Sequence, residues 1–171
     1  MSNRDNTSPR HQHIVHPIEP LYDENSRILI LGSFPSVKSR EQAFFYGHPQ
    51  NRFWRVLPAL YGEAPLTEIP EKRVFCARHG IALWDVIASC EIVGSSDSSI
   101  QNAVANDITP ILSAAPIEHI FTNGKTAGKL YDRYILPQIG KTAVCLPSTS
   151  PANAAWTLEK LISAWQIIRN L

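Results

Sequence analysis

The sequence predicts a three-layer α/β/α sandwich around a central four-stranded parallel sheet. The first observation is a set of short, nearly continuous apolar runs, which are typical of strands buried on both faces. The second is that segments of helical character separate these runs, and strands that alternate with helices favour a parallel sheet. The runs span residues 27–32, 80–86, 117–124 and 141–148.

The segments between the apolar runs predict the helices. In residues 51–61 the apolar side chains form one broad stripe, although Pro58 can kink or shorten this helix. Helix patterns and end signals predict the other helices. These helices are expected over residues 67–79, 99–105, 110–114, 125–134 and 158–170.

Length and composition indicate one folded domain. A chain of 171 residues can form one hydrophobic core but is too short for two ordinary domains. A hydrophobic content of 44% with 18% charged residues excludes a disordered chain. Residues 1–20 are polar, contain three prolines and show no periodicity. We therefore expect a flexible tail over residues 1–20 and a single domain over residues 21–171.

We expect a monomeric, cytoplasmic protein without a cofactor or metal. No stretch approaches 18 apolar residues, and the N-terminus lacks the apolar core of a signal peptide. The three cysteines are far apart and form no CxxC pair, so they predict buried thiols, with neither a disulfide framework nor a zinc or iron–sulfur site. His11, His13 and His16 lie in the expected tail, where an unliganded stretch is the simpler interpretation.

Polar residues follow each of the four predicted strands. They read GSFPS at 32–36, WD at 84–85, TNG at 122–124 and PSTSP at 147–151. Ligands of open α/β sheets bind at the carboxyl ends of the strands. The four strand ends therefore predict one common rim that holds a ligand.

The segment HPQNRFW at 48–54 predicts an anion site on this rim. Pro49 suits the first turn of a helix, and His48 before it suits an N-cap. Residues 50–52 would then offer free backbone N–H groups to an anion. The alternative is a plain helix start whose aromatic residues 53 and 54 face the core.

Residues after the first three strands are suited to contact a nucleobase. The backbone N–H of Ser33 or Phe34 can face a ligand after the turn at Gly32, although an ordinary turn also explains this motif. The Asn123 amide can pair with a base edge that presents N–H beside C=O, as hypoxanthine and uracil do; alternatively it only turns the chain. Asp85 can orient a water, accept a base N–H or cap a turn.

Basic and hydroxyl side chains near the rim suggest contacts with phosphates. Lys38, Arg40, Arg52 and Arg55 form a local basic cluster opposed only by Glu41, although a solvated loop with scattered charge is an equal alternative. The three hydroxyls of residues 148–150 precede Pro151, which can open a helix. They suit a DNA phosphate, or else form a Ser-Pro turn without a ligand.

Five segments at the predicted strand ends match a known family. They are GSFPSVKSR (32–40), FFYGHPQNRFW (44–54), LWDV (83–86), FTNGKTA (121–127) and PSTSPAN (147–153). With these segments the chain resembles the uracil-DNA glycosylase superfamily, and within it most closely the hypoxanthine-DNA glycosylases. The resemblance covers residues 27–156, roughly three quarters of the chain.

The resemblance implies a set of catalytic and base-binding residues. Asn51 and Asn123 would carry catalysis. Ser33, Phe34, Tyr46 and Asp85 would bind the base, with Tyr46 stacking on it and Asp85 at the position of the base-reading Asn of the uracil enzymes. The chain departs from the mismatch-specific members at Ser33, where they carry an Asn that holds the attacking water.

The resemblance also implies how DNA is held. Lys38, Arg52 and Lys125 would contact phosphates, together with the hydroxyls of Ser148, Thr149 and Ser150 in the final motif. Lys125 is the only lysine near the expected site, and a phosphate contact suits it better than a Schiff base. The implied activity is therefore monofunctional.

The sequence thus predicts an enzyme that hydrolyses the N-glycosidic bond of hypoxanthine flipped out of DNA and leaves an abasic site. One alternative is uracil or mismatch excision. Others are a non-catalytic module that binds nucleic acid or nucleotides on the same fold, and a flavodoxin-like phosphate binder.

Overall fold

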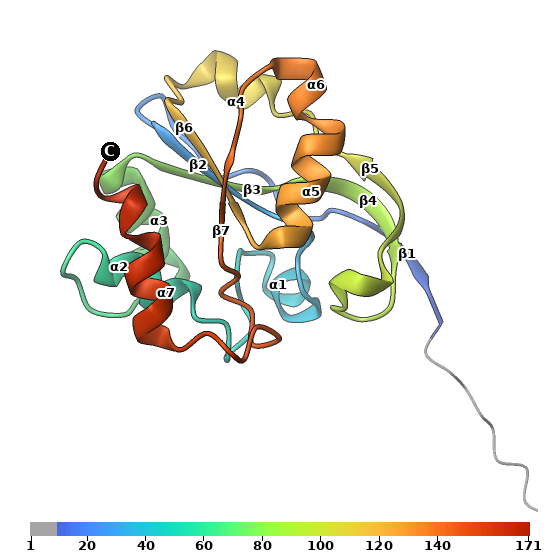
Figure 1. The fold of residues 1–171 in the computed structure, drawn as a ribbon, viewed down its shortest axis with the longest axis horizontal. Coiled ribbons are helices and arrows are strands. Elements are labelled where there is room, and N and C mark those ends of the chain that lie inside the picture. Colours follow the sequence, from blue (N-terminus) through green and yellow to red (C-terminus); the bar gives the residue numbers. More distant parts are fainter. Residues whose placement is uncertain (1–9) are drawn as a thin grey trace, which may run out of the picture.

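The computed structural model describes residues 10–171 and is built around a parallel sheet of four strands (Figure 1). The strands are β2 (Ile28–Gly32), β3 (Ile81–Asp85), β6 (His119–Asn123) and β7 (Val144–Leu146), in the order β3-β2-β6-β7. Every residue of β2 is buried, as expected for a central strand covered on both faces. The predicted four-stranded parallel sheet is confirmed.

Alternate residues of β2 belong to two separate cores, one on each face of the sheet. Ile28 and Ile30 lie in the first core, which is closed by α2 (Phe53–Ala59), α3 (Ile69–His79) and α7 (Leu158–Trp165). Leu29 and Leu31 lie in the second core, which is closed by α4 (Thr109–Ala114), α5 (Lys125–Tyr134) and α6 (Leu136–Ile139). These layers confirm the predicted α/β/α sandwich.

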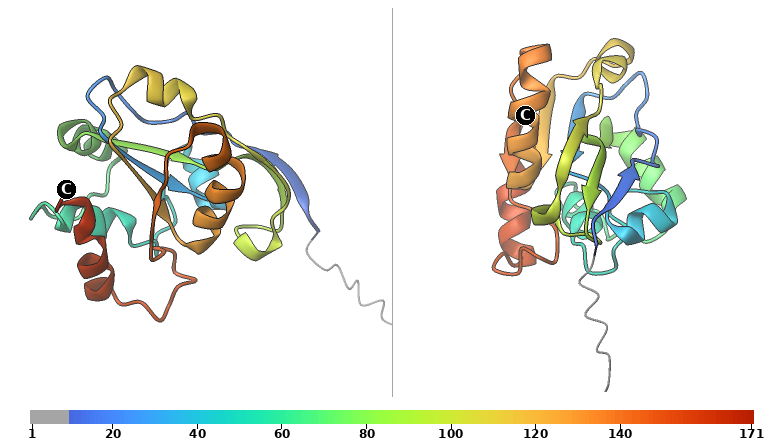
Figure 2. Two further views of the ribbon diagram at one scale, coloured as in Figure 1. Left: turned by 45° about the horizontal axis from the view of Figure 1, so that its top comes forward. Right: turned by 90° about the vertical axis from the view of Figure 1, so that its right-hand side faces the viewer.

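A second, antiparallel sheet lies beside the sandwich, in front in the right-hand view of Figure 2. It consists of β1 (Gln12–Val15), β4 (Ile87–Ile92) and β5 (Gln101–Ala105), in the order β1-β4-β5. The helix predicted over residues 99–105 was therefore wrong, because this segment returns along β4 as the second strand of a hairpin. Pairing with a neighbouring strand here overrides a weak local helix signal.

The expected tail of residues 1–20 also differs from the structure over residues 10–20. Strand β1 pairs with β4, with Ile14 opposite Cys90, and Ile18 is buried in the first core. Residues 1–9 of the expected tail lie outside the described residues. The apolar residues Ile14 and Ile18 hold this segment against the rest of the domain, although its composition alone suggests a flexible tail.

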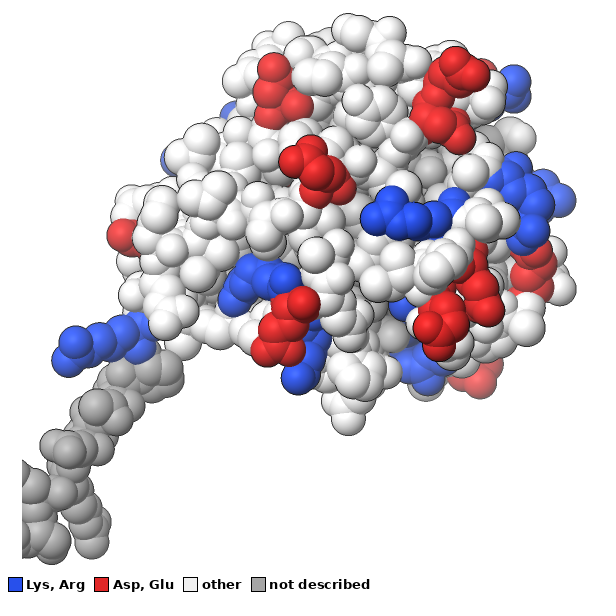
Figure 3. Space-filling model, turned by 180° about the vertical axis from the view of Figure 1, so that it is seen from behind, with Lys and Arg blue, Asp and Glu red and all other residues white. Residues whose placement is uncertain are grey.

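Three short elements complete the fold: α1 (Val37–Gln42), η1 (Asp97–Ser99) at the tip of the β4–β5 hairpin, and η2 (Gln166–Ile168). Of the three cysteines, Cys76 and Cys90 are buried as expected, whereas Cys145 on the edge strand β7 is exposed. Within residues 10–171, no helix combines the length and apolar character needed to cross a membrane. Basic and acidic side chains lie interspersed on the face opposite to that of Figure 1 (Figure 3).

Candidate active site

The carboxyl ends of the parallel strands lie at the lower edge of the sheet in Figure 1, together with α1 and the loop that follows β7. Gly32 at the end of β2 pairs with Asp85 at the end of β3, and Asn123 ends β6. The segment that connects α1 to α2 and the loop at 147–156 reach the same edge. We call this edge the rim.

One threonine joins the two predicted catalytic amides at the rim. The Thr149 hydroxyl donates to Asn51 Oδ1 (2.8 Å) and accepts from Asn123 Nδ2 (3.0 Å). The Thr149 backbone N–H donates to Asn123 Oδ1 (3.0 Å). Residues 72 positions apart in the sequence therefore converge on one buried side chain, which is 0% exposed. The convergence of Asn51 and Asn123 is what a shared site requires.

Two hydrogen bonds to its oxygen hold the Asn51 side-chain amide in place. Its nitrogen takes part in neither bond and is free to donate. Oδ1 accepts from the backbone N–H of Phe53 (3.0 Å), at the start of α2, as well as from Thr149. With both lone pairs engaged, the oxygen cannot also accept from a catalytic water. No partner within the described residues engages Nδ2. Asn51 can thus offer hydrogen-bond donors to a substrate but cannot take a proton.

The anion site predicted from free N–H groups at residues 50–52 was wrong. Helix α2 begins at Phe53, and each of these N–H groups already has an acceptor. Gln50 N–H donates to His48 Nδ1, Asn51 N–H to His48 O, and Arg52 N–H to Thr149 O. The segment instead turns before the helix, and this turn aims the Asn51 side chain at the rim.

Tyr46 provides an aromatic surface with a buried, unpartnered hydroxyl. Its φ of 54° is unusual for a bulky residue and marks a constrained position. The ring stacks on Phe53 with centroids 3.9 Å apart, which leaves only its other face for a base. Burial, with a contribution from Asp85, raises the pKa of Tyr46, and the Asn123 side chain opposes part of this rise. The raised pKa keeps the hydroxyl neutral, so it can donate a hydrogen bond. It has no hydrogen-bond partner within the described residues.

Gly32 allows Asp85 to approach the rim closely. A Cβ atom at Gly32 would lie 2.4 Å from Asp85 Oδ1 and 3.2 Å from the Tyr46 hydroxyl, so a side chain there would collide with both. Asp85 Oδ1 and the Tyr46 hydroxyl thus lie together at the end of β2. A buried polar atom without a partner, such as this hydroxyl, calls for a ligand or water.

His16 was expected to lie unliganded in a flexible tail, but in the structure it holds Asp85. His16 Nδ1 accepts the N–H of Ile18 (3.2 Å), which leaves the ring proton on Nε2. This N–H donates to Asp85 Oδ2 at 2.7 Å, and both side chains are buried. Asp85 is therefore an acceptor held in a fixed orientation. The only sequence signal was the pair of apolar residues, Ile14 and Ile18, that flank His16 in a polar segment.

Ser33 and Phe34 are placed differently from each other. The Ser33 hydroxyl donates to Asp97 Oδ1 (2.9 Å), and Asp97 belongs to η1 rather than to any of the predicted motifs. Phe34 packs in a third core with Ile87 and Cys90. Its ring meets His16 edge-on, with centroids 5.9 Å apart. The Phe34 side chain lies in the third core, not on the rim, and supports the His16–Asp85 pair through its contact with His16.

Arg52 holds the loop after β7 from inside. Its guanidinium donates to the backbone carbonyls of Thr149 (3.4 Å), Ser150 (2.9 Å), Asn153 (3.1 Å) and Trp156. These contacts differ from the expected contact between Arg52 and a phosphate. Thr149 likewise faces the two amides, where a phosphate contact was expected. The pair of residues 52 and 149 organises the rim.

The other residues expected to bind DNA lie near the surface. Lys125 is exposed at the start of α5, two residues after Asn123. Lys38 is exposed on α1 and pairs with Glu41 (3.2 Å). Ser148 and Ser150 are half-buried and accept local backbone N–H groups.

Most side chains of the expected basic cluster already have partners within the described residues. Arg40 is tied to the carbonyls of Pro35 and Gly94, whereas Arg55 is exposed.

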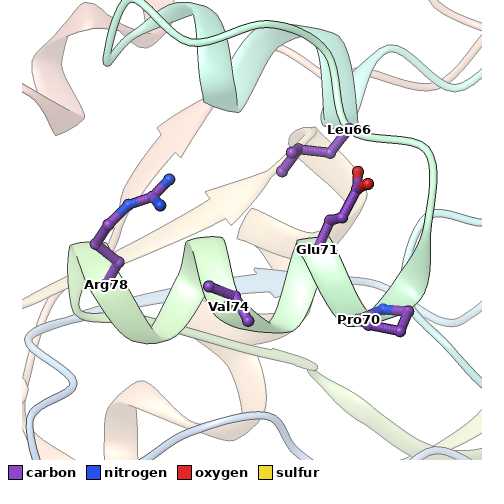
Figure 4. A pocket seen from close by; sticks show the side chains of 5 residues that line it. All are labelled: Leu66, Pro70, Glu71, Val74 and Arg78. Carbon is purple, nitrogen blue, oxygen red and sulfur yellow. The ribbon is translucent and has the colours of Figure 1, made fainter.

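Two hollows in the described surface are lined by residues other than these. One hollow runs along α3 and is lined by Leu66, Pro70, Glu71, Val74 and Arg78 (Figure 4). Another lies between residues 17–21 and 43–45. Among residues 10–171, no group of three or more His, Cys, Asp or Glu could hold a metal ion. The rim residues described above carry amide, hydroxyl and carboxylate groups.

The fold and the converging amides define an α/β/α protein with a candidate ligand site at the carboxyl edge of a parallel sheet. Comparison with known proteins identifies the family. The family model described as Uracil DNA glycosylase superfamily matches residues 19–169, and the chain belongs to this superfamily.

Two relatives from Methanosarcina species also match most of the chain. The Hypoxanthine DNA glycosylase of Methanosarcina acetivorans is 36% identical over 148 residues, which cover 85% of this chain and 92% of the relative. The protein of the same name from Methanosarcina barkeri is 35% identical with the same coverage. A solution NMR structure from M. acetivorans, described as that of a "putative Uracil DNA glycosylase", matches with a TM-score of 0.74 and 30% identity, and the match covers 94% of this chain and 98% of that one.

Proposed function

We propose that the protein is a DNA glycosylase of base-excision repair that hydrolyses the N-glycosidic bond of hypoxanthine and leaves an abasic site. The observation that carries the proposal is the junction of Asn51 and Asn123 through Thr149 at the rim. The names of the two Methanosarcina relatives support hypoxanthine as the base.

The rim groups suit the edge of a deaminated base. Hypoxanthine presents N1–H beside the C6 carbonyl. Asp85 Oδ1 would accept the N–H, and the remaining N–H of Asn123 or the Tyr46 hydroxyl would donate to the carbonyl. Adenine presents an acceptor at N1, which the Asp85 carboxylate would repel. The orientation in which His16 holds Asp85 therefore favours the deaminated base.

Base release requires that negative charge on the departing base be stabilised. The free Asn51 Nδ2 donors would supply this stabilisation, and one donor of this kind contributes about 10²–10³ in rate. Extrusion of the base costs a few kcal/mol, which is smallest at a mispaired or damaged base. Stacking on the open face of Tyr46 would return about 1–3 kcal/mol.

A duplex assay tests the proposed activity. We expect the wild-type protein to release base from DNA that contains inosine, with an alkali-labile abasic product, and to leave undamaged DNA intact. Parallel duplexes with uracil and xanthine define base preference. Binding to the inosine duplex without any abasic product would instead establish a non-catalytic module.

Uracil excision is the second candidate, because uracil presents the same N–H beside C=O edge to Asp85 and Asn123. The 30% identity to the structure assigned as a uracil DNA glycosylase also favours it. A faster release of uracil than of hypoxanthine would select this candidate. We further propose that the protein acts as a monomer in the cytoplasm, since one chain supplies all the rim residues described here.

Lys125 is proposed to contact a phosphate. Replacing Lys125 by Ala is expected to lower the slope of log K against log salt by about one, because one fewer counterion is released. The measurement is fluorescence anisotropy on an inosine duplex over a salt series. Arg133→Ala is the matched control, because Arg133 is exposed near the other end of α5, about 12 Å along the helix. A slope that Lys125→Ala leaves unchanged would place the phosphates elsewhere.

A further inference from the structure

The tip of the β4–β5 hairpin is fastened to the segment that follows β2. The Ser33 hydroxyl donates to Asp97 Oδ1 (2.9 Å), and the Val37 N–H donates to Ser95 Oγ (3.0 Å). The Arg40 guanidinium donates to the carbonyl of Gly94 (3.4 Å). These contacts join η1 to the end of β2, beside Gly32 at the rim. The hairpin thereby brings a second carboxylate, in addition to that of Asp85, to the rim.

Hydrolysis at the rim requires a group that can accept a proton from water. Asn51, Asn123 and Thr149 are neutral, and their mutual hydrogen bonds use the oxygens that could orient a water. Asp85 is a carboxylate, but its Oδ2 accepts from His16, and its Oδ1, which lies against Gly32 beside the Tyr46 hydroxyl, is the atom proposed to bind the base. Asp97 is different, because only Oδ1 is engaged within the described residues and the residue is open to solvent.

We propose that Asp97, held by Ser33, is the general base that takes a proton from the attacking water; this inference rests on the proposed glycosylase function. The water oxygen bonds to C1′ of the sugar while the bond from C1′ to the base nitrogen breaks. The base departs with that electron pair. Asp97 takes one water proton and later gives it to the released base or to solvent. The two carboxylates thus divide the work: Asp85 binds the base and Asp97 activates water.

The surroundings of Asp97 suit this role. Asp97 is exposed as a whole residue, but its carboxylate end lies against Ser33; this partial burial raises its pKa, the hydrogen bond from Ser33 lowers it in part, and the nearby Asp85 raises it further. A raised pKa makes the carboxylate a better proton acceptor. Cys90 on β4 also faces this carboxylate, and its thiol has a pKa raised by burial. The charged groups held nearest the hairpin tip are Arg40 on α1 and His11, whose Nε2 lies 2.9 Å from Ser99 O.

The first test replaces Asp97 by Asn, which retains the shape and can still hydrogen-bond to Ser33 but cannot take the proton. Under single-turnover conditions with saturating enzyme, we expect Asp97→Asn to release hypoxanthine about 10²–10⁴ times more slowly than wild type. The Kd for the inosine duplex should stay within about threefold. Asp132→Asn is the matched control, because Asp132 is exposed on α5. A wild-type rate for Asp97→Asn would overturn the inference.

The second test uses the pH dependence of the single-turnover rate. The rate should rise with pH as Asp97 loses its proton, and the low-pH limb should vanish in Asp97→Asn. Ser33→Ala removes the hydrogen bond that lowers the Asp97 pKa, so this limb should move to higher pH. An unmoved limb in Ser33→Ala would contradict the role, even if Asp97→Asn fails to fold. If the wild-type protein releases no base, the proposed glycosylase function is wrong. If Asp97→Asn releases base at the wild-type rate, only the role of Asp97 is wrong.

Discussion

Replacement of Asn51 by Asp is expected to slow base release about 10²–10³-fold while leaving the fold intact. Asp keeps an oxygen that can accept from the Phe53 N–H and from the Thr149 hydroxyl, which are the two contacts of Asn51 Oδ1. It replaces the free Nδ2 donors by a second oxygen, so the departing base loses the group proposed to stabilise it. Single-turnover release from an inosine duplex measures the rate, and thermal unfolding monitors the fold.

Asn51→Ala separates the two roles of this side chain. It removes the donor and also the oxygen that accepts the Phe53 N–H at the start of α2, so it should lose a similar factor in rate and, in addition, about 1 kcal/mol of stability. Wild-type rates in both variants would remove Asn51 from the chemistry. A loss of rate in Asn51→Ala alone would mean that its oxygen, by holding Thr149 and α2, is the part that matters.

The elements that the sequence predicted correctly are those defined by local patterns. The continuous apolar run at residues 27–32 needs cover on two faces, and this requirement alone implies a central parallel strand with helices on both sides. The polar residues after the strands were likewise predicted to share a rim, because parallel strands end at one edge of the sheet. Asn123 could be placed at the rim on this basis, whereas the family resemblance of residues 44–54 placed Asn51 in the same site.

The parts that could not be predicted depend on pairing between distant segments. Residues 101–105 are a strand because they pair with β4, and Gln12–Val15 is a strand for the same reason. His16 and Asp97 reach the rim through this second sheet, and neither carries a local signal of its position. The placement of Arg52 was missed for a related reason, since its partners are backbone carbonyls about 100 residues away.

The internal role of Arg52 predicts a large effect on stability. Replacing Arg52 by Met keeps much of the aliphatic length but removes every guanidinium donor to the carbonyls of the loop at 149–156. Hydrogen bonds from a charged donor contribute about 1.5–3 kcal/mol each, and they are not additive. For this half-buried side chain we expect a loss of roughly 2–4 kcal/mol in the free energy of unfolding. Chemical denaturation monitored by tryptophan fluorescence measures this loss.

Base release should fall together with stability in Arg52→Met, because Thr149 sits in the loop that Arg52 holds and joins Asn51 to Asn123. Arg55→Met is the matched control: Arg55 is exposed one turn further along the same segment, and its replacement makes the same change in net charge. That control should change the free energy of unfolding by less than about 0.5 kcal/mol. If Arg52→Met instead keeps wild-type stability and lowers the salt slope of DNA binding by about one, Arg52 contacts a phosphate as the sequence had suggested. The two readouts distinguish an arginine that builds the rim from one that binds the DNA backbone.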